Sequence, residues 1–500
     1  MEKSSRKLSK KEKIAFGMGS LPGAFYGSFV GQIQAFYYAW MGLSVIYILI
    51  AQVFYAIWNV INDPIFGVLQ DRTRTEKGRY IPWIKWFSPV FIAAFISIFF
   101  VPNEWRYAYA GENTQFLIFL WYLISQIFYD LAFTIVYLAH AALLPQVTGD
   151  FKERTEMSIF STAFGVIGSV VSIAFPLIFL TNPTQEKILG LKLTIVVFGI
   201  ASILPWIIIW TYMKERMELI PDIKESVFTN IKYVFKNPAC RIYMIYDGIT
   251  VGINNTFMIS ITFILPWIFG LDNPYGVQSV NFMDIIGYFV FPIICGVIGC
   301  WLQFWIPKKK DLKTLLLWDY IFMIIGFLTA FFGALPDPTQ SNIVFEVPPN
   351  VWLVSFGIGI FFLGFFGSLI YLNPLNADIV DYDELMTGNR RESVYSGVNC
   401  VLSKPMYSVV LIVFPTILTL YGLVPASPED PISNALVVVY GFKNAILGMA
   451  IASFLFPAIL AIIGFVTFIP YPLNGKKVAE IRKVLAEKHG RLRTAALNKA

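Results

Sequence analysis

Long hydrophobic stretches follow one another along almost the whole chain. A helix needs about 20 consecutive apolar residues to cross the hydrocarbon core of a bilayer. Stretches of this kind occur near residues 16–41, 43–70, 83–102, 116–146, 158–181, 191–213, 241–269, 278–306, 314–335, 351–376, 397–423 and 436–469. The pattern therefore predicts an all-α membrane protein with twelve transmembrane helices.

The second stretch carries a polar stripe on one face of its predicted helix. The residues of this stripe are Gln52, Tyr55, Asn59, Asn62, Asp63 and Phe66, which recur at spacings of three and four. A charge at the centre of a bilayer costs about 2.5 to 3.5 kcal/mol on insertion scales, so it usually faces a cavity and carries function. Asp63 therefore indicates transport. The alternative is a structural polar contact between helices.

Composition and charge agree with a membrane protein. Hydrophobic residues make up 57% of the chain and charged residues 14%, whereas a soluble domain is about one quarter charged. Thirty-three of the 38 lysines and arginines lie in seven segments that share one side of the membrane if the helices alternate in direction. We therefore expect a cell-membrane protein with both termini in the cytoplasm. Because the basic residues are spread over these segments, the net charge of +6 indicates no nucleic-acid partner.

Residue types that mark enzymes and metal proteins are scarce. The four cysteines are scattered and only two histidines occur, so we expect neither a disulfide framework nor a zinc site. No GxxxxGK(S/T) phosphate-binding loop is present, which argues against a nucleotide-powered pump. A membrane enzyme with a metal at Asp381 and Asp383 is an alternative from another class, but no large segment outside the hydrophobic stretches would form a catalytic domain. We expect no enzyme and no cofactor.

A charged segment divides the hydrophobic stretches into two sets of six. We expect a cytoplasmic N-tail (1–13), a first bundle (14–213), a cytoplasmic connector (214–240), a second bundle (241–469) and a cytoplasmic C-tail (470–500). Apolar residues at helical spacing in the connector predict a short helix along the cytoplasmic face. Two six-helix halves joined in this way are the layout of major facilitator transporters.

Two blocks of sequence resemble one transporter family. The first consists of NDPIFG (62–67), DRTRT (71–75) and GRYIPW (78–83), and the second of ADIVDYDE (377–384), RRES (390–393) and Lys404. Both are similar to the signature of the glycoside–pentoside–hexuronide:cation symporters, the melibiose-permease branch of the major facilitator superfamily. The resemblance implies two six-helix bundles and cation-coupled solute transport by alternating access.

The polar stripe is suited to binding a hard cation. Asn59, Asn62 and Asp63 offer three side-chain oxygens, and Thr134 in the fourth stretch should lie at a similar depth. Oxygen ligands suit sodium, whereas a buried carboxylate also suits a proton carrier. The resemblance implies that these four positions form the cation site, although the first of them is a carboxylate in melibiose permease and an amide here. Na+ and H+ therefore both stay open as the coupling ion.

Lys404 is a second charge within the hydrophobic stretches. It lies about as deep from the cytoplasmic side as Asp63 does. We expect the two side chains to pair, directly or through water, when no cation is bound. The alternative is a lysine that extends its amine to the membrane interface.

Charged residues at the cytoplasmic ends are expected to form a gate. The resemblance implies ion pairs between the two halves, and the candidates are Arg154, Asp378, Asp381, Arg390, Asp71 and Arg79. Such pairs would hold the halves together while the cavity opens outward. The alternative is a solvated surface with little energetic role. Gly67 and Gly78 of the first-half loop are expected to permit close helix approach and a turn.

The solute side departs from the family pattern. The resemblance places one sugar-binding carboxylate near Gly23 or Ala24, and further sugar contacts at Tyr137 and Ala141. No carboxylate stands at any of these positions. Asp130, on the same helical face as Tyr137, is the candidate replacement, with aromatic rings for stacking on a sugar. The candidate solute residues are Gln126, Asp130, Tyr137, Tyr26 and Asn373.

The leading prediction is a symporter that couples Na+ or H+ to a sugar or glycoside, acting as a monomer among membrane lipids. The alternative is a cation-coupled lysolipid transporter of the same branch. Lysolipid symporters resemble the same branch and keep a similar acidic pattern in their second span. They need an apolar cavity for the lipid chain. A chain with 17% aromatic residues and no family sugar carboxylates can supply such a cavity.

Overall fold

The computed structural model describes residues 8–147, 151–181, 183–215, 235–271, 275, 282–305, 311–339, 341–348, 350–387, 392–426, 436–481 and 483–485. The chain divides into two compact units. Unit 1 comprises Met1–Ile223, Ile261–Pro266 and Gly422–Val439, and unit 2 comprises Lys224–Ser260, Trp267–Tyr421 and Tyr440–Ala500. The helix expected in the connector lies outside the described residues.

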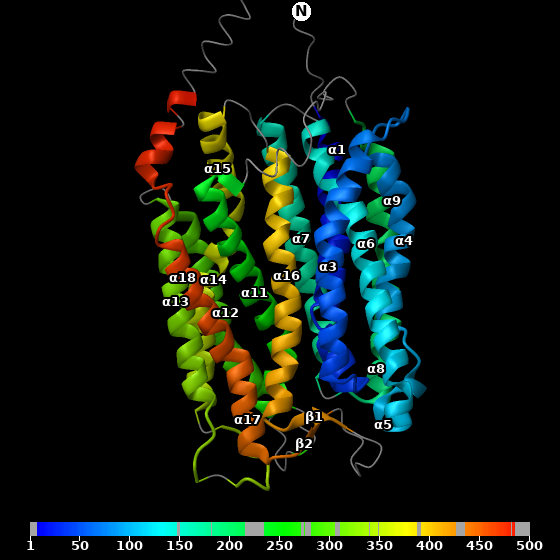
Figure 1. Ribbon diagram of the computed structural model, residues 1–500, viewed down its shortest axis with the longest axis vertical. Coiled ribbons are helices and arrows are strands. Elements are labelled where there is room, and N and C mark those ends of the chain that lie inside the picture. Colours follow the sequence, from blue (N-terminus) through cyan, green and yellow to red (C-terminus); the bar gives the residue numbers. More distant parts are fainter. Residues whose placement is uncertain are drawn as a thin grey trace, which may run out of the picture. The chain divides into compact units, whose positions relative to one another are not determined.

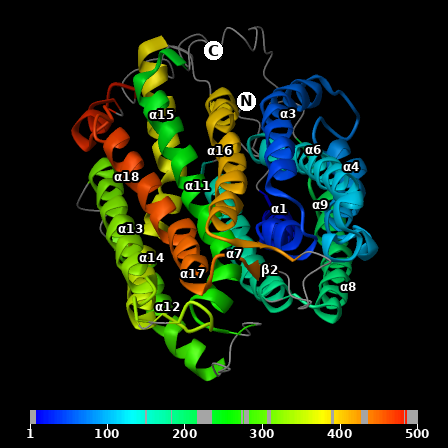
Figure 2. The same ribbon diagram turned by 60° about the horizontal axis from the view of Figure 1, so that its bottom comes forward.

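Long helices lying alongside one another make up most of unit 1 (Figure 1). Its helices are α1 (Lys10–Met18), α2 (Ser20–Val30), η1 (Ala35–Trp40), α3 (Val45–Arg72), α4 (Ile81–Phe99), η2 (Asn103–Trp105), α5 (Tyr107–Ala110), η3 (Gly111–Thr114), α6 (Gln115–Val147), α7 (Phe151–Leu180), α8 (Gln185–Ala201) and α9 (Ile203–Tyr212). Helix α6 packs against α3 and α4, and α7 packs against α1 and α2. Helix α1 lies between α7 and α9, both of which it contacts (Figure 2).

The first hydrophobic stretch is divided into three helices. Gly19 separates α1 from α2, and η1 is a π-helix. A Cβ at Gly19 would overlap the ring of His140 on α6, whose Nε2 lies 2.9 Å from the carbonyl oxygen of Phe16. The chain therefore comes close to α6 at the point where its helix is interrupted.

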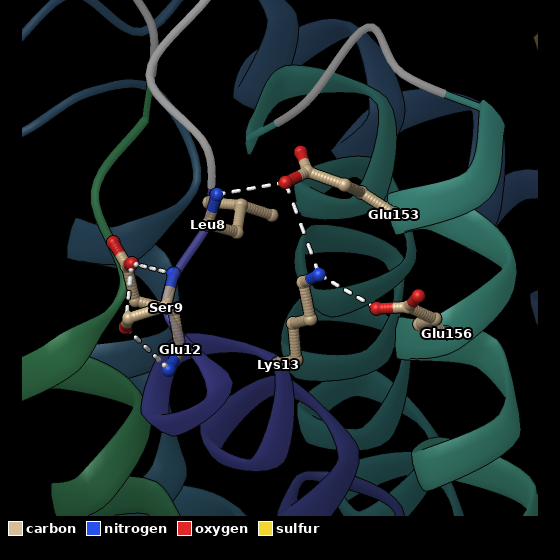
Figure 3. A network of polar contacts seen from close by, with 6 residues as sticks. All are labelled: Leu8, Ser9, Glu12, Lys13, Glu153 and Glu156. Carbon is tan, nitrogen blue, oxygen red and sulfur yellow. Dashed lines mark hydrogen bonds and ion pairs between the residues drawn. The ribbon is translucent and has the colours of Figure 1, made fainter.

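Polar contacts hold the beginning of α1 against α7 (Figure 3). Ser9 and Glu12 form a capping box that satisfies free backbone N–H groups of α1. The Lys13 ammonium donates to Glu156 at 2.6 Å and lies 3.8 Å from Glu153. Glu153 also accepts the backbone N–H of Leu8 at 2.8 Å. These contacts orient the N-terminal helix on α7.

Unit 2 is likewise helical. Its elements are α11 (Pro238–Trp267), α12 (Phe282–Trp305), α13 (Leu312–Ala334), α14 (Val351–Ile370), α15 (Leu372–Thr387), α16 (Glu392–Leu420), α17 (Phe442–Ala450), η6 (Ile451–Leu455) and α18 (Phe456–Phe468); the last turns of α11 belong to unit 1. Helix α13 packs against α14 and α18, and α12 packs against α14 (Figure 1). Glycines such as Gly326 and Gly357 allow the α13 and α14 backbones to touch, because a Cβ at either would overlap the other helix.

Among the described residues, ten helical segments are long and apolar enough to span a membrane. The other two predicted stretches are the divided first one and α12, whose apolar part Gly287–Gln303 is shorter. A small sheet was not predicted. Strands β1 (Leu423–Pro425) and β2 (Leu436–Val438) pair antiparallel, with Val424 opposite Val437. The Tyr38 hydroxyl donates to the carbonyl oxygen of Leu423 at 2.6 Å and ties β1 to η1.

Candidate cation and solute site

Helix α3 has a buried polar face and an exposed apolar face. Gln52, Asn59 and Asn62 are 0%, 4% and 1% exposed. The large apolar residues that are exposed on the same helix are Ile46, Leu49, Ile50, Val53, Phe54, Ile57, Ile61, Ile65 and Leu69. A helix with this division turns its apolar side to lipid and its polar side to protein. The stripe predicted from spacing is therefore an inward-facing surface.

A matching polar stripe lies on α6. Tyr122, Gln126, Asp130 and Thr134 recur every four residues and are all buried. The amide Nε2 of Gln52 donates to the Tyr122 hydroxyl at 2.7 Å and to Oε1 of Gln126 at 3.0 Å. The two stripes thus meet along the contact between α3 and α6.

One or two helical turns further along α3 and α6, the contact between the two helices contains aspartate side chains. The Asn62 amide nitrogen donates to Asp130 Oδ2 at 2.8 Å and to Thr134 Oγ1 at 3.0 Å. The Thr134 hydroxyl in turn donates to Asp63 Oδ1 at 2.9 Å. We call Asn59, Asn62, Asp63, Asp130 and Thr134 the acidic cluster. It contains two carboxylates that a chain of hydrogen bonds connects.

Two oxygens of the acidic cluster are buried without a hydrogen-bond partner. They are the Oδ1 atoms of Asn59 and Asn62. A buried polar atom left unpaired costs about 1–3 kcal/mol, so such atoms call for an explanation. The remaining oxygens of the cluster belong to carboxylates and a hydroxyl. The cluster is therefore an oxygen-rich, negatively charged environment of the kind that holds a hard cation.

The structure brings the predicted cation residues together. Asn62, Asp63 and Thr134 are joined by hydrogen bonds, and Asn59 lies one turn before Asp63 on the same face of α3. Asp130, expected on the solute side, also belongs to this cluster. Lys404 lies on α16 in unit 2, whereas Asp63 lies in unit 1, so their pairing stays a prediction.

The aromatic solute candidates lie in the core of unit 1. The Tyr26 ring is 0% exposed and stacks on Phe95 with 3.9 Å between ring centroids. The Tyr137 hydroxyl donates to the carbonyl oxygen of Gly19 at 3.0 Å, and its ring stacks on Phe133. Both rings pack against protein in this structure, and their roles toward a solute stay predictions.

Two positions of the family's sugar contacts face each other and are filled. A Cβ at Gly23 would overlap the Tyr137 hydroxyl. The tyrosine ring therefore extends into the space beside Gly23, where the resemblance implies carboxylates. Gln126 lies in the polar contact with Gln52, and the Asn373 side chain lies outside the described residues.

The gate candidates are only partly described. The side chains of Arg154, Asp71 and Arg390 lie outside the described residues. Asp378 is buried, Asp381 is half-buried and both lie on α15. Arg79 is 2% exposed, and its backbone N–H donates to Glu215 at 2.6 Å. The gate itself stays a prediction.

Glu215 caps α4, a role that sequence reasoning missed. No side chain at the start of α4 caps it. The Glu215 carboxylate instead accepts the backbone N–H groups of Arg79, Tyr80 and Ile81 at 2.6, 2.7 and 2.8 Å. A carboxylate at a helix N-terminus is favoured by both hydrogen bonding and the helix dipole. Glu215 comes from a segment far away in sequence, so no local motif signals the contact.

The two glycines of the first-half loop differ. Gly78 has φ of +117°, and a Cβ there would overlap the Glu215 carboxylate. The predicted turn at Gly78 is confirmed, because its N–H bonds to the Thr75 carbonyl at 3.1 Å. The close approach expected at Gly67 is not seen among the described residues, where a Cβ would meet Leu138 at an ordinary 3.6 Å.

Unit 2 contains a buried carboxylate that sequence reasoning did not single out. Asp319 on α13 is 2% exposed and accepts a 2.6 Å hydrogen bond from Gln303 of α12. The Tyr371 hydroxyl donates to Gln303 Oε1 at 2.7 Å. A charged residue type within an apolar stretch was the available signal.

The fold and this site define a multi-pass membrane transporter of the major facilitator type. The sequence profile of the family described as MFS/sugar transport protein matches residues 15–475. The chain therefore belongs to this family, as the two sequence blocks indicate.

Known proteins similar to the chain are transporters. It is 22% identical to the isoprimeverose transporter of Lactiplantibacillus pentosus over 69% of this chain and 66% of that protein. It is 25% identical to the sodium-dependent lysophosphatidylcholine symporter 1 of Xenopus tropicalis over 34% of this chain and 31% of that protein. The nucleoside transporter NupG shares the fold, with a TM-score of 0.54, 14% identity and coverage of 92% of this chain and 100% of that one.

Proposed function

We propose that the chain is a secondary active transporter that couples entry of Na+ or H+ to import of a sugar or glycoside. The acidic cluster is the observation that carries this proposal. It combines two carboxylates with two unpartnered amide oxygens on the inward faces of α3 and α6. Carboxylates inside a membrane protein usually mark an ion or substrate pathway, and oxygen ligands suit a hard cation.

In the proposed cycle, the coupling ion neutralises charge at the cluster. In the empty transporter, the proposed pairing of Lys404 with Asp63 offsets the negative charge that the ion otherwise neutralises. We propose that the halves change orientation when the transporter is fully loaded or empty, and not when only the cation is bound. Downhill entry of the cation then drives uptake of the solute. Charged residues at the cytoplasmic ends, with Asp378 and Asp381 on α15, supply the proposed gate.

The sugar or glycoside assignment is supported by family membership and by the isoprimeverose transporter among the relatives. We further propose a monomer in the cell membrane, surrounded by lipid and with both termini in the cytoplasm. The chain has no enzymatic activity, no cofactor besides the coupling ion and no nucleic-acid partner in this proposal.

A lysolipid is the second candidate solute. One relative is a sodium-dependent lysophosphatidylcholine symporter. In addition, the tyrosine ring of Tyr137 fills the space beside Gly23, where the resemblance implies sugar-binding carboxylates. An aromatic wall at this place suits an apolar chain better than a polyhydroxylated ring.

Uptake into proteoliposomes tests the function. Labelled glycosides, pentosides, uronides and lysophosphatidylcholine are offered under separately imposed Na+ and proton gradients. We expect saturable, gradient-driven accumulation of a glycoside, which Asp63→Asn abolishes. Asp319→Asn, which removes a buried aspartate of unit 2, is the matched control and should retain uptake.

Two outcomes count against this assignment. Intact accumulation in Asp63→Asn places the cation site elsewhere. Accumulation of lysophosphatidylcholine without any glycoside uptake replaces the sugar by a lysolipid.

A further inference from the structure

We propose that Asp130 is a ligand of the coupling ion, and that the ion is Na+. This inference rests on the proposed function and deepens it. Asp130 supplies the second carboxylate of the site from α6, where Asn59 leaves only an amide on α3. Asp63 and Asp130 then hold the ion from two different helices.

Asp130 is directed toward α3 through both of its carboxylate oxygens. Oδ2 accepts the Asn62 amide at 2.8 Å, and Oδ1 accepts the Tyr55 hydroxyl at 3.4 Å. Asn62 and Tyr55 both belong to the polar stripe of α3. The carboxylate is 5% exposed. These contacts place the Asp130 carboxylate against the polar stripe of α3.

Unpartnered oxygens give independent support for a ligand at this place. Asn62 uses its amide nitrogen for Asp130 and Thr134, so its Oδ1 lies within the same cluster and is left without a partner. Asn59 Oδ1, one turn away, is also buried and unpartnered. A proton on a carboxylate would satisfy one acceptor at most. A metal ion can be approached by several oxygens at once, which favours Na+ over H+.

The negative charge of the acidic cluster also favours binding of Na+. Asp63 alone would balance a bound Na+ with one negative charge, whereas Asp63 and Asp130 together give the cluster two. The Thr134 hydroxyl, which donates to Asp63 Oδ1 and accepts from Asn62, connects the two acids. Two acids on separate helices repel one another, and a cation between them offsets that repulsion. Binding of Na+ should therefore tighten the contact of α3 with α6.

Direct Na+ binding tests the inference without a known solute. Binding of radioactive Na+ to purified full-length protein is measured at constant ionic strength, with choline as the replacement ion. The thermal stabilisation by NaCl, LiCl and KCl is compared at several pH values. We expect Asp130→Asn to weaken Na+ binding at least about tenfold, the order seen when a metal-site group is lost. We expect Asn59→Asp in the Asp130→Asn background to recover most of the affinity, because it returns a carboxylate to the cluster from α3.

Controls separate this inference from the proposed function. Asp319→Asn should keep wild-type Na+ binding, and each variant must elute as a monodisperse protein with the wild-type thermal transition in choline. Unchanged Na+ binding in Asp130→Asn, with loss in Asp63→Asn, overturns the inference and leaves the transport proposal standing. Loss of solute affinity with unchanged Na+ affinity in Asp130→Asn also overturns it. Stabilisation by low pH and by no metal ion overturns the choice of Na+, and unchanged binding in both variants counts against the cation site as a whole.

Discussion

Asn62 joins the two helices of the acidic cluster. Its amide nitrogen donates to Asp130 and Thr134 on α6, while its own backbone belongs to α3. Asp63, the next residue, reaches the same threonine. Two adjacent residues of α3, Asn62 and Asp63, therefore make these contacts. Thr134 is the α6 residue that hydrogen-bonds to both of them. The hydroxyl of Thr134 can be removed with little change of shape.

Replacing Thr134 by valine should weaken cation binding about tenfold, the lower end of the range for lost metal-site groups. The substitution keeps the volume of the side chain and removes the hydroxyl that donates to Asp63. Thr134→Ser retains the hydroxyl and should bind Na+ as the wild type does. Radioactive Na+ binding to both variants checks the prediction. Equal affinities would show that the hydroxyl plays no part in the site.

Gly78→Ala should destabilise the protein by about 1–3 kcal/mol. The residue has a positive φ of +117°, and a new Cβ would overlap the Glu215 carboxylate. Thermal unfolding in detergent should show a lower Tm. Gly67→Ala is the matched control: Gly67 lies within α3, where a Cβ meets Leu138 at an ordinary 3.6 Å, and the substitution should stabilise by about 0.5–1 kcal/mol through helix propensity. A Gly78→Ala protein as stable as the wild type would contradict the geometry.

At the scale of elements, the N-terminal end of α4 depends on a residue that follows α9 in the sequence. The Glu215 carboxylate accepts three hydrogen bonds from backbone N–H groups at the start of α4, those of Arg79, Tyr80 and Ile81. The contact links segments 136 residues apart in sequence. It attaches the beginning of the connector to the start of α4.

Glu215→Gln should cost about 1–3 kcal/mol, because it removes the charge and one of the two acceptor oxygens. A lower Tm in detergent is the expected result. Glu112→Gln, at an exposed glutamate of η3, is the control and should leave the Tm nearly unchanged. Equal Tm values for wild type and Glu215→Gln would mean that water replaces the cap at no cost.

The ion pair of α1 with α7 should contribute less. Lys13 and Glu156 are 14% and 39% exposed at the side chain, and such pairs are worth about 0.2–1 kcal/mol. A double-mutant cycle with Lys13→Gln and Glu156→Gln measures the coupling. We expect it to shrink further at high salt. A coupling energy well above this range would make the pair a main anchor of α1.

At the scale of the whole molecule, substitution of Lys404 tests whether a residue of unit 2 affects cation binding in unit 1. If Lys404 pairs with Asp63 when no cation is bound, then Lys404→Ala removes an internal competitor for the cation. We expect the Na+ concentration for half-maximal uptake to change, while Lys443→Ala, at a half-buried lysine at the start of α17, has no effect. Unchanged cation dependence would assign Lys404 to the membrane interface.

Much of the fold follows from residue patterns alone. Apolar length and helical spacing are properties of consecutive residues, so they locate most of the membrane helices and the polar face of α3. The interruption at Gly19 and the pairing of β1 with β2 escaped prediction because each depends on residues outside its own segment: the His140 ring on α6 for the first, and the partner strand for the second.

For the site, the sequence by itself determined that α3 carries a polar stripe with Asp63 and that Asp130 and Tyr137 share one face of α6, because a period of three to four residues is visible in one segment. Only the tertiary structure decided which neighbouring segment each of these residues contacts. Asp130 and Tyr137 share a face of α6, yet the first contacts Asn62 and the second contacts Gly19. The physical reason is that hydrogen bonds and steric fit join residues of different helices, and no pattern within one helix specifies its neighbour.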